Sequence, residues 1–404
     1  MINTPPLGLY IHIPWCVKKC PYCDFNSHEH HSKQLPEKKY LNALINDLDS
    51  ELKLVDEQRE IHSVFIGGGT PSLLSGDFYI QLFTALNQRL NFSVNAEITI
   101  EANPGAVDEA NFKGFIDAGI NRISLGAQSF SDAALNRLGR IHDNRSIYHA
   151  FETARKCGFD NINVDLMHGL PEQSLAEGLD DLKAAFELSP EHISWYQLTI
   201  EKNTVFYNRP PTLPVENILD NLFITGLETL ANAGYQQYEV SAFARDAKQS
   251  QHNKNYWRFG DYIGIGAGAH GKITGDNGAV TRRWKTRSPS DYLNLESNIN
   301  AENIINAENN INAENNINTE NKLAGSTVIA KEDLPLEFMM NALRLNQGFT
   351  SQLFEQRTGL DFSLVKDPIL QLQDQGLMDL SGKHYHTTEK GRLFLNNVIA
   401  KFSE

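Results

Sequence analysis

Residues 9–23, LYIHIPWCVKKCPYC, place a short apolar run directly before three closely spaced cysteines. The run Leu9–Pro14 is β-branched and aromatic and ends in proline, which is typical of a buried strand. Cys16, Cys20 and Cys23 follow it in CxxxCxxC spacing. Three thiolates on one tight loop can hold three irons of a cubane iron–sulfur cluster. The fourth iron would stay open, because no fourth cysteine is nearby.

Zinc is the competing metal for this loop. A structural zinc site needs four ligands, usually in paired CxxC spacing. His12 or His28 would have to complete such a site, since the last cysteine of the chain, Cys157, is distant in sequence. The spacing therefore favours a cluster over zinc.

Five further runs have the composition of buried strands, and helical patterns separate them. Alternation of strands and helices predicts an α/β fold with a parallel sheet. Six units are fewer than the eight of a closed barrel, so we expect an incomplete (β/α)6, TIM-like barrel. The five runs are Ser63–Ile66, Glu97–Glu101, Arg122–Leu125, Asn161–Leu166 and His192–Ile200.

Polar or glycine-rich residues stand where these strands end, and parallel α/β folds carry their active sites at that edge. We therefore expect one site built from several strand ends. The residues concerned are Cys16, Gly67–Pro71, Glu101, Gln128, Asp165 and Gln197.

The chain divides into four parts. We expect a barrel over 1–240, an extension over 241–295, an Asn-rich disordered insert over 296–330 and a small domain over 331–404. The insert carries a six-residue repeat that matches no helical period. The last part has three helical patterns, a strand-turn-strand and a final helix, which predicts a winged-helix-like α+β domain. The helix 363–375, which would read DNA in such a domain, has one cation, Lys366, so we expect a structural or docking role rather than DNA binding.

Composition narrows the function classes. Of the 404 residues, 36 are Lys or Arg and 50 are Asp or Glu, a net charge of −14 that disfavours nucleic acid as a partner. No apolar run approaches the roughly 18 residues of a membrane span. The first residues lack a signal-peptide pattern. We therefore expect a cytoplasmic protein.

The cysteine loop after a first strand resembles that of the radical S-adenosylmethionine superfamily. The resemblance implies a [4Fe–4S] cluster whose open iron chelates the amine and carboxylate of S-adenosylmethionine. An injected electron then cleaves the C–S bond to give methionine and a 5′-deoxyadenosyl radical. The GGGTP motif after the second strand matches the family's glycine motif, in which Gly68, Gly69 and Thr70 let backbone groups approach the ligand closely. Tyr22 would lie against the adenine.

Further motifs resemble the coproporphyrinogen III dehydrogenase-like branch of that superfamily: YIHIPWC, FIGGGTPSLL, EITIEANPG, NRISLGAQSF, LGRIHD and NVDLMHGLPEQ. By matched motif position, the S-adenosylmethionine site would also include Tyr10, Glu101, Gln128, Arg140 and Asp165. Glu101 and Asp165 could accept from ribose hydroxyls or the ammonium, and Arg140 could pair with the carboxylate. The alternative for Arg140 and Asp165 is a structural salt bridge.

Two functions compete within this branch. The oxygen-independent oxidase decarboxylates coproporphyrinogen III, whereas the heme-chaperone type binds heme and delivers it to apoproteins. The oxidase type has a longer segment before its first cysteine and a further cysteine two residues after the third. Fifteen residues precede Cys16 here, and Phe25 stands at the second position. We therefore expect a chaperone without oxidase activity and assign no catalytic residue. A metal-stabilised scaffold without chemistry is a third interpretation.

The chaperone type also carries an HNxxYW motif, which matches His252-Asn253-Lys254-Asn255-Tyr256-Trp257. Neutral imidazole is an ordinary axial ligand of heme iron. We expect His252 to ligate heme, Asn253 to orient it, and Tyr256 and Trp257 to flank the porphyrin, with His270 as a second candidate ligand. Expected partners are heme-accepting apoproteins, respiratory enzymes among them, and an electron donor. A homodimer and peripheral membrane association stay open.

Overall fold

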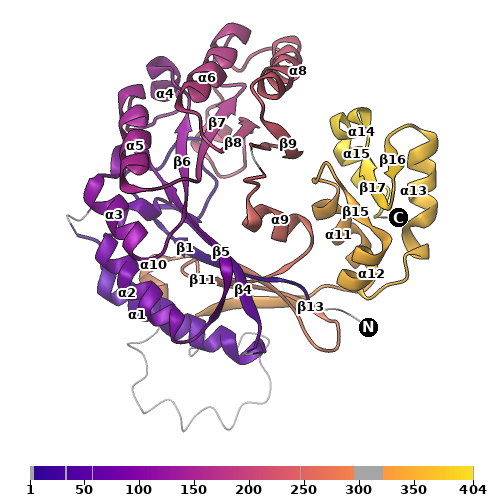
Figure 1. Cartoon of the computed structure of the whole chain (residues 1–404), viewed down its shortest axis with the longest axis horizontal. Coiled ribbons are helices and arrows are strands. Elements are labelled where there is room, and N and C mark those ends of the chain that lie inside the picture. Colours follow the sequence, from indigo (N-terminus) through magenta and orange to yellow (C-terminus); the bar gives the residue numbers. More distant parts are fainter. Residues whose placement is uncertain (1–3, 32–33, 57, 246, 295–321, 404) are drawn as a thin grey trace.

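Six parallel strands form the centre of the fold. The computed structural model of the protein describes residues 4–31, 34–56, 58–245, 247–294 and 322–403. The six strands lie side by side in chain order (Figure 1), which confirms the expected α/β fold. They are β1 (Leu7–Ile13), β4 (Glu60–Gly68), β5 (Asn91–Ala102), β6 (Arg122–Gln128), β7 (Ile162–His168) and β8 (His192–Gln197). The last strand ends at Gln197, three residues earlier than expected.

Helices connect these strands and cover the outer face of the sheet (Figure 1). Local sequence explains where several begin: Ser75 accepts a hydrogen bond from the backbone N–H of Phe78 at the start of α2, and Ser174 and Glu177 cap α6 reciprocally. The helices are α1 (Glu37–Glu51), α2 (Gly76–Asn87), α3 (Glu109–Asp117), α4 (Asp132–Arg137), α5 (Asn144–Cys157), α6 (Leu175–Leu188), α7 (Val205–Asn208) and α8 (Glu216–Asn232). Single 3-10 turns lie at Leu52–Leu54, Pro71–Leu73 and Pro104–Ala106.

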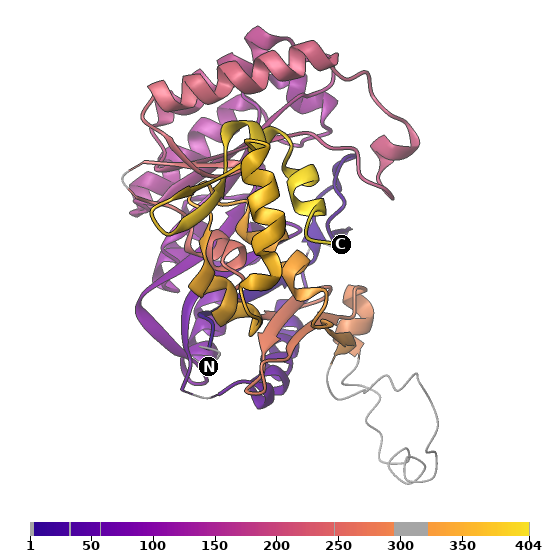
Figure 2. The ribbon, with the colours of Figure 1, turned by 90° about the vertical axis from the view of Figure 1, so that its right-hand side faces the viewer.

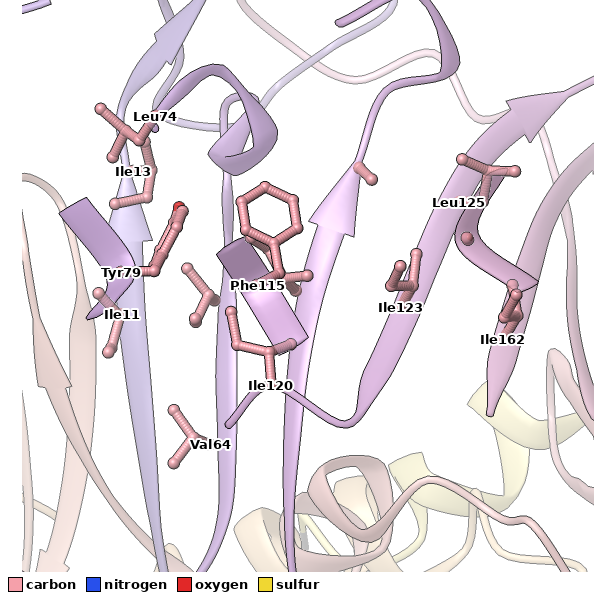
Figure 3. Close-up of a cluster of buried hydrophobic side chains, with 14 of the residues drawn as sticks. Ile11, Ile13, Val64, Leu74, Tyr79, Phe115, Ile120, Ile123, Leu125 and Ile162 are labelled. Atoms are coloured by element: carbon pink, nitrogen blue, oxygen red, sulfur yellow. The ribbon is translucent and has the colours of Figure 1, made fainter. Parts of the chain in front are cut away.

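The main hydrophobic core lies between the sheet and these helices. Ile11 of β1 and Val64 of β4 belong to one buried cluster with Tyr79 of α2 and Phe115 of α3 (Figure 3). All four side chains have 0% exposure. Parallel strands carry such continuous apolar runs because helices cover them. Truncating a side chain of this kind costs about 2–5 kcal/mol, so the core holds the strand ends in fixed positions.

Further strands extend the sheet at both edges. On one side β11 (Asp261–Ile265) pairs parallel to β1, and β12 (His270–Thr274), β13 (Val280–Lys285) and β14 (Leu323–Val328) follow antiparallel. On the other side β10 (Ala242–Ala244) and β9 (Gln236–Glu239) follow β8. Within the described residues β14 and β9 are separate edges, so the sheet does not close on itself. The barrel geometry stays a prediction.

The insert is shorter than the sequence indicated. Residues 296–330 were expected to be disordered, but Leu323–Val328 forms β14, because β13 offers an edge with which it pairs. The Asn-rich repeats themselves fall within residues 295–321, outside the described residues. The other domain boundaries stay predictions.

A buried ionic network attaches the extension to α1. Lys285 on β13 is 1% exposed, and its Nζ lies 2.5 Å from Asp47 Oδ1 and 2.6 Å from Glu51 Oε1. Arg283 adds a 3.0 Å pair to Glu51. The hydroxyl of Tyr292, on α10 (Pro289–Asn294), donates to Asp47 at 2.7 Å. Buried charges of this kind must be paired, so the network fixes β13 against α1.

The C-terminal domain packs around a second hydrophobic core, in which Phe338 and Phe354 lie together with Phe259 and Val280 of the extension. Its helices and its three-stranded sheet match the expected winged-helix-like pattern, but the final helix is broken in two at Phe394. Figure 2 shows the domain in front of the sheet. Its elements are α11 (Leu334–Ala342), β15 (Phe349–Thr350), α12 (Ser351–Thr358), α13 (Ser363–Asp374), β16 (Met378–Ser381), β17 (His384–Thr387), α14 (Glu389–Leu393) and α15 (Leu395–Ala400). No helix that the structure describes, in this domain or elsewhere, has the length and apolarity to cross a membrane.

Candidate functional site

The cysteine loop leaves the carboxyl end of β1 and folds back on itself. A short parallel pair, β2 (Trp15–Cys16) and β3 (His28–Glu29), closes the loop. Within it, the N–H of Cys23 donates to the carbonyl of Cys20 at 3.1 Å. Cys16 is buried, whereas Cys20 and Cys23 are partly exposed, and all three thiols are free. The loop therefore presents three thiols from a compact backbone.

The glycine motif packs directly against this loop. The N–H of Gly69 donates to the carbonyl of Ile13 at 2.7 Å, and the hydroxyl of Thr70 donates to Cys16 Sγ at 3.4 Å. A Cβ on Gly69 would lie 2.6 Å from the carbonyl oxygen of Trp15. Gly68 has φ +115°, and a Cβ there would meet the ring of His12 at 2.5 Å. Glycine is required at both positions by this close approach.

A cavity of about 540 Å³, here called the cluster cavity, opens where the strands end. Such a volume is typical of a small-molecule site. It brings together the three cysteines and all but one of the residues that the sequence assigned to S-adenosylmethionine. Its walls include Cys16, Cys20, Tyr22, Cys23, Gly68, Gly69, Thr70, Glu101, Gln128, Arg140 and Asp165. The exception, Tyr10, lines a second cavity.

The thiols fit an iron–sulfur cluster with one open iron. Cys16, Cys20 and Cys23 line this cavity. Cys157 lies elsewhere, at the end of α5, where its thiol contacts the carbonyl of Glu109. Burial raises the pKa of the Cys16 thiol, the Thr70 hydroxyl acts in the opposite direction, and the other two thiols add to the rise. Iron binding would hold these sulfurs as thiolates.

The two histidines considered for zinc are engaged elsewhere. The ring of His12 donates from Nε2 to the carbonyl of Asn26 and accepts at Nδ1 from the hydroxyl of Tyr10, both at 2.9 Å. The Nε2 of His28 lies 3.2 Å from Asn26 Oδ1. In the part of the chain that the structure describes, no three ligating side chains converge on a single metal ion.

Two carboxylates line the cavity from β5 and β7, the strands on either side of β6. Burial raises the pKa of Glu101 to about 7, and the charge of Asp165 adds to the rise, while the N–H of Gly68 at 3.1 Å lowers it. Burial also raises the pKa of Asp165, whose two oxygens accept at 2.8 Å from Ser124 and Asn163. Both carboxylates can therefore accept from a hydroxyl or ammonium group of a ligand.

Arg140 and Gln128 complete the polar wall. The Arg140 guanidinium donates to the carbonyl of Gly126 at 2.8 Å and contacts Cys20 Sγ at 3.6 Å, while its Nε has no partner. Among the described residues neither Arg140 nor Asp165 forms an ion pair, so the structural salt bridge is not present. Gln128 has φ +70° and accepts from the Tyr196 hydroxyl at 2.9 Å. Strained backbone of this kind is typical of functional positions.

The HNKNYW motif forms helix α9 (Gln251–Trp257), which lies between the sheet and the C-terminal domain (Figure 1). The helix separates the motif into two pairs, because residues four apart share a face. Asn253 and Trp257 line the cluster cavity. His252 and Tyr256 line the second cavity, of about 660 Å³, together with Tyr10. The two cavities adjoin each other, since Phe25, Gly68 and Glu101 line both, and the assignment of the four motif residues to heme stays a prediction.

The ring of His252 is enclosed by aromatic side chains. It stacks on Phe65 at 4.4 Å and lies 4.6 Å from Tyr256, between ring centroids. Burial lowers its pKa to about 3, so the ring is neutral. Only 9% of the residue is exposed. His252 and Tyr256 line the second cavity, whereas Phe65 lines the cluster cavity.

Sequence reasoning missed several residues that position these cavities. Glu97 on β5 accepts from the N–H groups of Gln251 at 2.8 Å and His252 at 3.2 Å, and so caps α9. Arg344 of the C-terminal domain lies 4.4 Å from the Trp257 ring, lines the cluster cavity and pairs with Glu239 at 3.6 Å. No local pattern signals either role, because their partners are distant in sequence.

Comparison with known proteins gives the family. Residues 10–185 match the radical SAM superfamily model, and residues 329–394 match the HemN C-terminal domain model. The proteins named heme chaperone HemW of Haemophilus influenzae, Escherichia coli and Bacillus subtilis are 47%, 45% and 33% identical, over 100%, 100% and 97% of this chain and 99%, 99% and 98% of theirs.

The solved structure of coproporphyrinogen III oxidase (HemN) from Escherichia coli, described as a radical SAM enzyme, shares the fold. It matches with a TM-score of 0.79 at 24% identity, covering 99% of this chain and 90% of that one. The full-length relatives, together with the cysteine and glycine loops, place the chain in the HemW family of radical SAM proteins.

Proposed function

We propose that the protein binds heme and delivers it to apoproteins, and that it carries a [4Fe–4S] cluster and S-adenosylmethionine. The names of its full-length relatives support this proposal. Within the chain, the supporting observation is helix α9, whose motif side chains line both cavities. A helix in that position can couple occupancy of one cavity to the other.

The iron–sulfur cluster and S-adenosylmethionine would share the cluster cavity. Cys16, Cys20 and Cys23 would hold three irons, and the nucleotide would meet the open side. When bound, the cluster supplies the electron that cleaves the sulfonium reductively. The glycine backbone and Thr70 would bind the methionyl group, Tyr22 would cover the adenine, and Glu101 and Asp165 would accept from hydroxyls or the ammonium. Arg140 would pair with the carboxylate.

The proposed partners follow from this role. They are heme-accepting apoproteins, respiratory enzymes among them, and an electron donor for the cluster. We propose a cytoplasmic location, with a homodimer and peripheral membrane association as further proposals. The cluster would gate heme transfer or dimerisation rather than support an oxidase reaction.

Heme titration of the cluster-loaded protein tests the proposal. We expect saturable binding, with a change in the heme absorption spectrum. His252→Ala should weaken heme binding and leave the iron content of the cluster unchanged, because the ring forms part of the second cavity. His149→Ala, an exposed histidine on α5, is the matched control. Absence of saturable heme binding by the wild-type protein would refute the chaperone function.

The alternative function is oxygen-independent coproporphyrinogen III dehydrogenation. Phe25, 61% exposed, stands where the oxidase type has a further cysteine, and this departure argues against it. Reduced, cluster-loaded protein should be incubated with S-adenosylmethionine and coproporphyrinogen III. We expect no protoporphyrinogen IX, and its formation would replace the chaperone with the enzyme.

A further inference from the structure

The second cavity has a cationic side that neither the cluster nor the HNKNYW motif explains. It lies between α9 and the β12–β13 hairpin, and Arg282 and Arg287 line it together with His270. The two arginines come from β13 and from the loop that follows this strand. The aromatic residues Tyr10, His252 and Tyr256 line the same cavity, as do the acidic residues Asp24 and Glu101.

The strand register places His270 beside Arg282. His270 is paired with Trp284 across the antiparallel ladder, and Lys272 is paired with Arg282. His270 and Arg282 are therefore diagonal neighbours on one face of the hairpin, roughly 7–8 Å apart. Arg287 is close as well, because after burial both arginine charges contribute to lowering the pKa of His270. The imidazole of His270 is exposed and donates no ring hydrogen bond to any described residue.

The two guanidiniums are available to acidic groups. Arg287 is exposed and forms no ion pair within residues that the structure describes. Arg282 already binds one carboxylate, since its guanidinium lies 2.5 Å from Glu337 of α11, yet 44% of its side chain is exposed. A guanidinium has five donors in a planar fork, so a second carboxylate can bind beside the first.

Aromatic side chains line the same cavity and suit a flat apolar ring. Tyr10, His252, Tyr256 and Tyr262 are among its lining residues, and Tyr256 and Tyr262 stack at 4.2 Å with 22° between their planes. The exposed face of such a ring can stack on a planar ligand. A cavity of about 660 Å³ lies within the usual range for ligands of this size.

We infer that this cavity binds a planar tetrapyrrole by its carboxylate edge, with Arg282 and Arg287 holding the two carboxylates and His270 facing the metal. The inference rests on the proposed function and deepens it, because it assigns the cargo to this cavity and the axial ligand to His270 rather than to the enclosed His252. The imidazole nitrogen donates its lone pair to the iron, and no covalent step is required.

Three probes separate these roles: heme, iron-free protoporphyrin IX and the dimethyl ester of protoporphyrin IX. The cluster-loaded full chain is titrated with each and followed by absorbance. Arg287→Gln should weaken the binding of heme and protoporphyrin about tenfold or more, as expected for a lost charge-assisted bond. The affinity for the ester should stay unchanged. Arg145→Gln, 91% exposed, is the matched control. Equal binding of all three probes to wild type and Arg287→Gln would overturn the carboxylate assignment.

His270→Ala should shift the absorption spectrum of bound heme and weaken heme binding, while protoporphyrin binding stays unchanged. An unaltered heme spectrum in His270→Ala, with an altered one in His252→Ala, would overturn the ligand assignment. Both results presuppose that the wild type binds heme. If it does not, the proposed function itself fails, so the two failures are distinguishable.

Discussion

Binding of S-adenosylmethionine should depend on pH through Glu101. Burial raises the pKa of this carboxyl to about 7, and Asp165 adds to the rise. Near neutral pH the ligand-free protein therefore holds a proton there in about half of its molecules. A ligand that brings a sulfonium and an ammonium close to Glu101 favours the carboxylate, so binding should release this proton.

The magnitude follows from the shift. If binding returns the pKa of Glu101 from about 7 to near 4.5, its ordinary value, affinity at pH 6 should be about tenfold weaker than at pH 8. The stability of the ligand-free protein changes with pH in the opposite direction to the affinity. Because the pKa of Glu101 is raised in the folded state, protonation of this carboxyl favours folding. Its contribution to the free energy of unfolding is complete below pH 4.5 and is lost as the pH rises to about 7. That loss is on the order of 3 kcal/mol.

The assay is anaerobic titration calorimetry of cluster-loaded protein at pH 6, 7 and 8, in two buffers with different heats of ionisation. Glu101→Gln should remove the part of the pH dependence and of the proton release that belongs to this carboxyl. The ligand's own ammonium contributes equally to both proteins and cancels in the comparison. Glu152→Gln, an exposed carboxyl on α5, is the control. A wild-type affinity that is constant from pH 6 to 8, or an equal slope in Glu101→Gln, would refute the reasoning.

Other parts of the molecule give three further predictions. Lys285→Met leaves the two carboxylates of α1 buried without their lysine, so the free energy of unfolding in urea should fall by about 3–5 kcal/mol; a loss below 1 kcal/mol would contradict the network. Gly69→Ala forces a Cβ against backbone, which costs about 1–3 kcal/mol, and iron retained after gel filtration should fall. Deleting 300–320 should leave iron and sulfide content unchanged, and failure to fold would show that the segment is structural.

The local sequence determined the strands and the cluster loop. Apolar runs ending in proline, glycine or polar residues predicted the six parallel strands, since a strand buried on both faces carries a continuous apolar signal. The CxxxCxxC and GGGTP motifs were also recognisable from the sequence, because the backbone geometry of such short loops depends mainly on residues close by in the chain. Parallel strands bring their carboxyl ends to one edge, so residues as far apart as Cys16 and Asp165 could be assigned to one cavity from the sequence.

The tertiary structure alone decided what surrounds the HNKNYW motif. The pattern HNKNYW names four candidate residues but not the surroundings of the helix, which depend on Glu97, 155 positions before His252. It also decided that His270 and Arg282 share a face, because antiparallel register is fixed by pairing rather than by composition. Contacts between distant segments arise from the packing of the whole chain, so a local sequence pattern does not indicate which distant residues will contact it.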